Sequence, residues 1–165
     1  MGKHDPMYSR QCGFTLVELV VTMIVIAIMA YVAVPRFSML DGYDEAGYRD
    51  KVKAALQYAR KAAISHRRFV CVSTAGNDVT LTIESVVPES TAGTCPTSLP
   101  LPATDRSCSP AAANKVCHPT GVTLTSGTII FSAEGRPTVG AGTYTVAGSH
   151  GSETITVESE SGYVH

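Results

Sequence analysis

The chain has 165 residues, with 13 Lys and Arg side chains against 14 Asp and Glu side chains, and its formal net charge is −1. This balance argues against a protein that binds nucleic acid through an overall positive charge. About 130 residues follow Pro35, which is enough for one small domain and too few for two.

The first distinctive segment is an apolar stretch that follows the residues Gly-Phe-Thr-Leu-Val-Glu at positions 13–18. Sixteen uncharged residues, 19–34, come after Glu18 and end at Pro35. As a helix, residues 14–34 would be about 31 Å long, close to the thickness of a bilayer hydrocarbon core. The sequence therefore predicts one transmembrane helix over 14–34. A carboxylate inside such a helix is expected to have a function.

Two other interpretations of this stretch are weaker. A secretory signal peptide would have an uninterrupted apolar core and small residues before its cleavage site, but Glu18 interrupts the core and no such site precedes Pro35. A buried core helix is less favoured still, because uncharged runs of this length usually span membranes.

The pattern from Gly13 through Phe14 and Glu18 to the Ala-rich end at Pro35 resembles the N-terminus of type IV pilins and pseudopilins. The resemblance implies that residues 1–13 are a cytoplasmic leader, with Lys3 and Arg10 on the side favoured for positive charge. It also implies that a prepilin peptidase cuts between Gly13 and Phe14 and that the new Phe14 amine is then methylated. In the filament, the Glu18 carboxylate would neutralise the Phe14 amine of a neighbouring subunit.

This resemblance also implies the location and partners of the protein. The chain would cross the bacterial inner membrane once, with residues 35–165 as a periplasmic domain, and would later enter a filament. Its partners would be other pilin subunits, the prepilin peptidase and the inner-membrane assembly platform. We expect neither a cofactor nor a metal.

Five cysteines are present, and Cys12 would leave with the leader. The remaining four, Cys71, Cys95, Cys108 and Cys117, form an even set, which in an exported domain indicates disulfides with three possible connectivities. Our working interpretation pairs Cys95 with Cys108 and Cys71 with Cys117. A zinc site is disfavoured because no C-x-x-C spacing occurs.

A second helix is predicted over residues 44–65, with Asp44 as its cap. Apolar residues recur there at helical spacing, with charged residues elsewhere around the helix. This apolar stripe should pack on the domain's own sheet; it consists of Tyr48, Val52, Leu56, Ala59 and Ala63.

Strands are expected in the remainder, residues 69–165. Residues 69–74 are strand-like, and in 79–85 threonines alternate with Val, Leu and Ile; a Gly-containing turn lies between the two segments, which predicts a hairpin. Residues 86–127 contain six prolines and show no usable period, and three further strands are predicted at 128–132, 143–147 and 154–158. The expected fold is α+β, with a long N-terminal helix packed on an antiparallel sheet.

The order of helix, hairpin, variable loop and strands around Gly135-Arg136-Pro137 resembles GspH/FimT-type minor pseudopilins and minor pilins. Residues 44–72 also resemble minor pilins of the mannose-sensitive haemagglutinin pilus. These resemblances imply a minor subunit, at or near the filament tip and helping to initiate assembly, in a type IV pilus or a type II secretion pseudopilus.

The alternative function is a pilus-associated DNA receptor for natural transformation. Some FimT-type proteins bind DNA through Gly-Arg-x-Arg, but residues 135–138 read Gly-Arg-Pro-Thr, which leaves Arg136 as the single candidate contact. One arginine supplies little phosphate affinity. A second basic cluster, at the end of the predicted helix, is better explained as a solvated helix terminus; it comprises Arg60, Lys61, His66, Arg67 and Arg68.

Catalysis and calcium binding are not expected. Ser149-His150 and Cys117-His118 place nucleophiles beside histidines, yet catalytic partners usually come from separate segments. Asp41, Asp44 and Glu45 do not follow a calcium-loop spacing, so we expect them to cap the helix.

Overall fold

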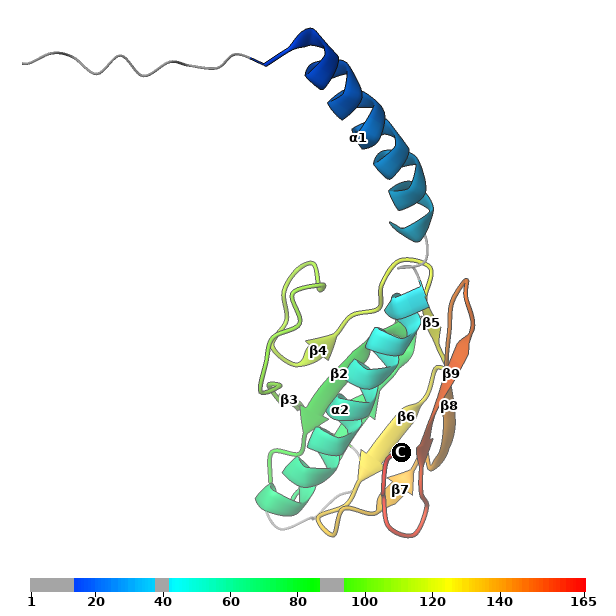
Figure 1. Cartoon of the computed structure of the whole chain (residues 1–165). Helices are drawn as coiled ribbons and strands as arrows, with labels where there is room; N and C mark the ends of the chain where they lie inside the picture. The colour runs from blue at the N-terminus through cyan, green and yellow to red at the C-terminus, as the bar shows by residue number, and fades with distance from the viewer. Residues whose placement is uncertain (1–13, 38–41, 87–93) are drawn as a thin grey trace, which may run out of the picture. The chain divides into compact units, whose positions relative to one another are not determined.

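The first helix, α1, comprises Leu16–Phe37 and belongs to the first of two compact units, Met1–Leu40 and Asp41–His165. The computed structural model describes residues 14–37, 42–86 and 94–165, and the side chains of α1 as far as Tyr31 (Figure 1). Within these described ranges, no helix combines the length and the apolar character needed to cross a membrane.

The second unit begins with α2, Gly42–His66, and continues almost entirely as strands. Asp44 lies inside the first turn of α2 instead of capping it, because the helix starts at Gly42. The remaining elements are β1 (Val70–Ser73), η2 (Ala75–Asn77), β2 (Val79–Ile83), β3 (Thr97–Ser98), β4 (Lys115–Val116), β5 (Thr123–Leu124), β6 (Thr128–Phe131), β7 (Pro137–Val139), β8 (Gly142–Ala147) and β9 (Ser152–Val157).

The strands form two antiparallel sheets (Figure 1). The larger sheet has the order β3-β2-β1-β6-β7, with β4 also paired to β2, and the smaller has the order β5-β8-β9. Both are anchored by hairpins: β1 and β2 place Val72 opposite Leu81, and β8 and β9 place Tyr144 opposite Ile155. The architecture is α+β, as the sequence predicts.

Helix α2 lies on both sheets, contacting β1, β2, β4 and β6 of one and β8 and β9 of the other. The apolar stripe predicted from the sequence is the buried face of this helix, and its five members are at most 1% exposed. Strand β2 alternates buried and half-buried residues, as expected of a strand with one face against a helix. The core thus lies between α2 and the sheets, and Phe131 and Ile155 are buried in it.

The structure differs from the sequence prediction between residues 94 and 139. Strands β3, β4, β5 and β7 were not predicted, and the strands form two sheets instead of one. The missed strands are two or three residues long, too short to show a period of two. Pairing with longer strands positions them: Ser98 of β3 lies opposite Thr82 of β2, and Lys115 of β4 lies opposite Thr80 of β2.

Candidate functional site

The first turn of α1 carries the residues expected to matter most for assembly. Thr15 precedes the helix, and its Oγ1 accepts a hydrogen bond of 3.2 Å from the Glu18 backbone amide. Glu18 is therefore the third residue of the helix, where a carboxylate interacts favourably with the helix dipole. The sequence Thr-x-x-Glu is a capping-box signature, a signal that our sequence prediction missed.

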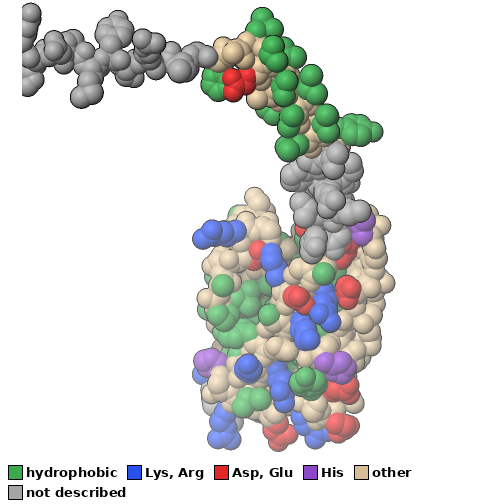
Figure 2. Space-filling view, in the orientation of Figure 1, with side chains coloured by type: hydrophobic (Ala, Val, Ile, Leu, Met, Phe, Trp, Pro, Cys, Tyr) green, Lys and Arg blue, Asp and Glu red, His purple; other side chains and the backbone are tan. Residues whose placement is uncertain are grey.

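Apolar side chains cover the described part of α1 and are exposed (Figure 2). Phe14 is 79% exposed, and Ile26 in the middle of the helix is 65% exposed. Thr22 satisfies its hydroxyl by donating to the Leu19 carbonyl, 2.9 Å away. Glu18 is then the only acidic residue in α1, and its charge lacks an ion-pair partner among the residues described.

In the second unit, the first turn of α2 is attached to the turn between β8 and β9. Glu45 is only 4% exposed, and its Oε1 accepts a hydrogen bond of 3.0 Å from the His150 amide. This bond is the main cause that lowers the pKa of Glu45. The close approach requires glycine at position 148, because a Cβ there would lie 2.2 Å from the Glu45 carboxylate oxygen.

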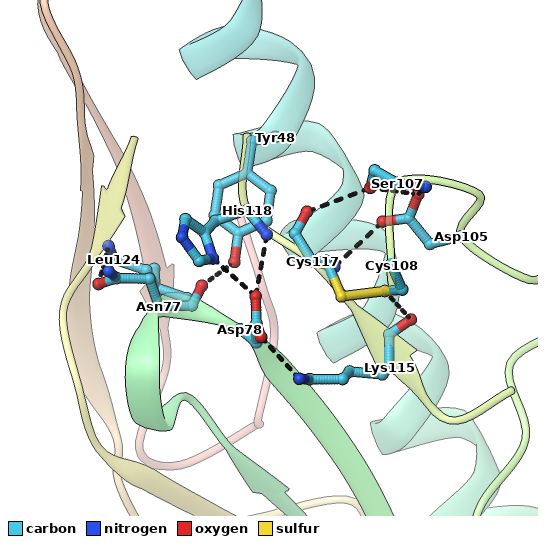
Figure 3. Close-up of polar contacts among 10 residues, drawn as sticks. All are labelled: Tyr48, Asn77, Asp78, Asp105, Ser107, Cys108, Lys115, Cys117, His118 and Leu124. Carbon is cyan, nitrogen blue, oxygen red and sulfur yellow. Dashed lines mark hydrogen bonds and ion pairs between the residues drawn. A yellow bond between two sulfur atoms is a disulfide. The ribbon is translucent and has the colours of Figure 1, made fainter. Parts of the chain in front are cut away.

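The second turn of α2 is attached to the turn between β1 and β2 (Figure 3). The Tyr48 hydroxyl donates to the Asn77 carbonyl, and the Asn77 side-chain oxygen accepts from the Leu124 amide at 3.1 Å. Burial is the main cause that raises the pKa of Tyr48. Asn77 thus connects α2, the β1–β2 turn and strand β5 of the smaller sheet.

Asp78 is the centre of a polar cluster beside this contact (Figure 3). Its carboxylate lies 2.7 Å from Lys115 Nζ and 2.7 Å from His118 Nδ1, and it accepts a further bond from the His118 amide. Burial acts to raise the pKa of Asp78, but the hydrogen bonds from Lys115 and His118 outweigh it and lower the pKa to about 2. The cluster ties β4 and the segment after it to the start of β2.

Asp105 plays a similar part in the neighbouring loop (Figure 3). It accepts hydrogen bonds from Ser107 and from the Cys117 amide, and Lys51 Nζ of α2 lies 3.1 Å away. Burial opposes these bonds, which nevertheless lower the pKa of Asp105 to about 2. The Cys108–Cys117 disulfide closes the same loop.

Two protein-family models match this chain. A model of the prokaryotic N-terminal methylation motif matches residues 8–33. A model of the type II transport protein GspH matches residues 50–162, more than half of the chain. The chain belongs to the GspH family.

Solved structures support the GspH-family fold. The Pseudomonas aeruginosa PAO1 type IV minor pilin FimU in space group P21 matches with a TM-score of 0.55 and 14% identity, covering 77% of this chain and 90% of FimU. FimU in space group P65 matches with a TM-score of 0.52 and 16% identity, covering 73% and 90%. A search of curated proteins found no match. The family matches confirm the predicted minor pilin or pseudopilin class, and the FimU structures confirm the fold.

The match to the methylation motif contains all three residues predicted to act in processing and assembly. Phe14 lies two residues before α1, and Glu18 lies in the first turn of this helix. Gly13 and the rest of the predicted leader, residues 1–13, lie outside the described residues.

The disulfide pairing chosen from the sequence is wrong. Cys71 bonds to Cys95, with Cα atoms 6.0 Å apart, and Cys108 bonds to Cys117, with Cα atoms 5.2 Å apart. The register explains why Cys71 does not reach Cys117: Cys71 lies opposite Thr82, whereas the residue before Cys117 lies opposite Val79. Three residues along a strand are about 10 Å, beyond the roughly 7 Å that a disulfide can span.

Arg136, the candidate DNA contact, lies where β7 begins, and its Nη2 is 2.6 Å from Glu160 Oε2 in an exposed ion pair. Arg60, from the basic cluster, donates its Nε to backbone carbonyls, and Arg68 Nη1 lies 3.5 Å from the Glu84 carbonyl. Neither the GspH match nor the FimU structures support the DNA-receptor alternative.

The Ser-His and Cys-His neighbours differ from each other in the structure. Ser149 Oγ lies 2.8 Å from His150 Nδ1, so these two sequence neighbours face each other. Glu45 Oε1 is 4.0 Å from the same Nδ1, whereas a catalytic triad uses both ring nitrogens. Cys117 is bonded to Cys108 and is not a free thiol.

Proposed function

We propose that this GspH-family chain is a minor filament subunit, cleaved between Gly13 and Phe14, methylated on Phe14, and incorporated into a type IV pilus or a type II secretion pseudopilus. Its role is structural, at or near the filament tip and early in assembly, and not catalytic. Its partners are other pilin subunits, the prepilin peptidase and the assembly platform.

The observation that carries this proposal is the first turn of α1. Glu18 is the lone acidic side chain of an otherwise apolar, exposed helix, and it lies within the methylation-motif match. In a bundle of such helices, a buried carboxylate is costly unless an opposite charge is near. The amine of a processed Phe14 in the next subunit supplies that charge.

The proposed location follows from the same segment. Residues 14–34 would anchor the precursor in the inner membrane, with residues 35–165 in the periplasm as one domain. The periplasm is an oxidising compartment, and the two disulfides of the second unit are consistent with it.

Mass spectrometry of the mature N-terminus tests the processing step. The chain is expressed with and without a prepilin peptidase, and we expect a chain beginning at N-methyl-Phe14 only when the enzyme is present. Gly13→Leu should leave the precursor uncut. Cleavage after Val34, or an uncut wild-type chain in both cells, would contradict the proposal.

Three variants test the role of Glu18 apart from its place in the helix cap. Glu18→Gln keeps a side chain that suits the third position of a capping box but removes the charge, and it should be cleaved yet fail to enter filaments. Glu18→Asp keeps the charge, and Thr15→Ala keeps Glu18 while weakening the cap by about 1 kcal/mol. Both should assemble better than Glu18→Gln in a filament shearing assay; equal incorporation of Glu18→Gln and wild type would exclude a charge-based role.

A further inference from the structure

A small pocket lies between α2 and the C-terminal segment and includes Arg60 of the basic cluster. Its volume is about 220 Å³, and it is lined by Gln57, Arg60 and Lys61 of α2 and by Tyr163 and Val164. The space corresponds to roughly seven water molecules at about 30 Å³ each, so one sugar-sized ring fits.

The arginine of this pocket is held in place by two turns. Arg60 Nε donates to the Gly135 carbonyl at 3.2 Å and to the Ser161 carbonyl at 3.1 Å. The turns can meet only because glycine occupies position 162, where a Cβ would lie 2.0 Å from the Gly135 carbonyl oxygen. Arg60 is therefore fixed before any ligand binds, which reduces the entropy lost on binding.

The opposite wall of the pocket is also fixed. Gln57 Nε2 donates to the Val164 carbonyl at 3.1 Å. The next residue, His165, exchanges two backbone hydrogen bonds with Thr156 of β9, at 2.9 and 3.1 Å. The segment that carries Tyr163 is thus an extension of the smaller sheet.

The pocket is positively charged because its cations are not neutralised. The acceptors of Arg60 Nε are neutral carbonyls, and neither Arg60 nor Lys61 forms an ion pair within the described part of the chain. Three acidic residues lie on or beside the turns that hold Arg60. Glu160 lies 2.6 Å from Arg136, Glu158 lies 3.8 Å from His165 and pairs with it when that histidine is protonated, and Glu134 is exposed.

An apolar wall stands beside the cations. Tyr163 is 56% exposed although it belongs to a fixed segment, and Val164 is buried behind it. A sugar ring offers an apolar C–H face to an aromatic ring, and a carboxylate on that ring can reach the cations. We propose that this pocket binds a carboxylate carried on a sugar ring, as in a uronic acid residue of an acidic glycan.

The test uses four probes that separate charge from ring. The full chain in a polyoxyethylene detergent, which contains no sugar, is titrated with glucuronate, glucose, acetate or inorganic phosphate at constant ionic strength, and binding is followed by saturation-transfer NMR. We expect glucuronate to bind at least about tenfold more tightly than glucose or acetate. Binding of phosphate or acetate as tight as that of glucuronate would overturn the proposal and indicate a general anion surface.

Matched variants place the binding at this pocket. Lys61→Gln should weaken glucuronate binding about two- to fivefold, the range expected for a partly exposed ion pair. Tyr163→Ser should weaken glucuronate binding and leave acetate binding unchanged. Lys53→Gln makes the same charge change on α2 outside the pocket and should leave binding unaltered, with melting temperatures confirming that all three fold. Equal losses in Lys61→Gln and Lys53→Gln would also overturn the proposal.

Discussion

The two helices are similar in length, 22 residues in α1 and 25 in α2, but they differ in the exposure of their apolar side chains. In α2 the apolar stripe is buried against sheets of the same unit, whereas every described side chain of α1 is exposed. An amphipathic helix can bury its one apolar face against its own domain, but a helix that is apolar all round needs lipid or other helices to cover it. The stability of the second unit is therefore a property of one chain, and the apolar surface of α1 requires something outside its own unit.

Substitutions in the two units should show the largest contrast. Phe131 is fully buried, and Phe131→Ala should lower the free energy of unfolding of the second unit by about 3–5 kcal/mol. Ile26→Ala in α1 removes an exposed side chain and should leave that unfolding transition unchanged. Thermal melts followed by circular dichroism of the full chain in detergent compare the two, and equal shifts would contradict the independence of the units.

Removing each disulfide measures how much that bond contributes to the stability of the second unit. In the chain-entropy model, Cys71–Cys95 closes a loop of 24 residues in separation and contributes about 3.5 kcal/mol, and Cys108–Cys117, with a separation of 9, about 2.7 kcal/mol. The double Cys→Ala variant of Cys71–Cys95 should therefore have the lowest melting temperature, the variant of Cys108–Cys117 an intermediate one, and the wild type the highest. The reverse order would show that the short loop, with Asp105 and Lys51, contributes more than its length predicts.

Acid should weaken the second unit through two half-buried aspartates, Asp78 and Asp105. Asp78 and Asp105 have pKa values of about 2 in the folded protein against an ordinary value of 3.8, so their stabilisation is complete above about pH 4 and is lost as the pH falls toward 2. The loss should be on the order of 2 kcal/mol for each group. Urea midpoints measured from pH 5 to pH 2 test this.

Two variants, studied by the same pH titration, assign the loss of stability in acid to the two aspartates. Asp78→Asn and Asp105→Asn should each be less stable than wild type at pH 5 and should each lose less stability on acidification. Their carboxylates use different cations, Lys115 and Lys51, but they accept from the adjacent amides of His118 and Cys117, so the double variant should depart from the sum of the two reductions. A wild-type slope in both variants would exclude these groups as its source.

The smallest effect is expected at the surface. Arg136→Ala removes an ion pair whose side chains are 51% and 86% exposed, and it should cost 1 kcal/mol or less. Glu160→Gln is the control, because it breaks the same pair and should cost the same. If Arg136→Ala alone were much more destabilising, Arg136 would have a second structural role.

The parts of the structure that the sequence predicts are those with a local period. The stripe from Tyr48 to Ala63 repeats every three or four residues, and β2 alternates directly after the Gly-containing turn that follows β1, so helix and hairpin are both visible without tertiary information. Strands β3 and β4 have two residues each and exist because β2 offers them an edge. No local pattern can reveal such strands.

The candidate site residues also fall into two groups, those that belong to a local sequence motif and those whose role depends on tertiary contacts. Gly13, Phe14 and Glu18 belong to one short motif, so they could be named from the sequence. The cysteine pairing depends on which end of β2 each residue reaches, and the importance of Asp78 and Glu45 depends on donors 40 and 105 residues away. These contacts follow from topology, which the sequence does not display.

The attachment of α2 has a mechanical consequence. Glu45 and Tyr48 lie on successive positions of one face, and they hold the first two turns of the helix to the β8–β9 turn and the β1–β2 turn. A pull applied at Gly42 is therefore shared between the two sheets before it reaches the apolar stripe further along α2. The hydrogen bonds of Glu45 and Tyr48 therefore resist a force applied at the N-terminal end of α2 before that force reaches the core.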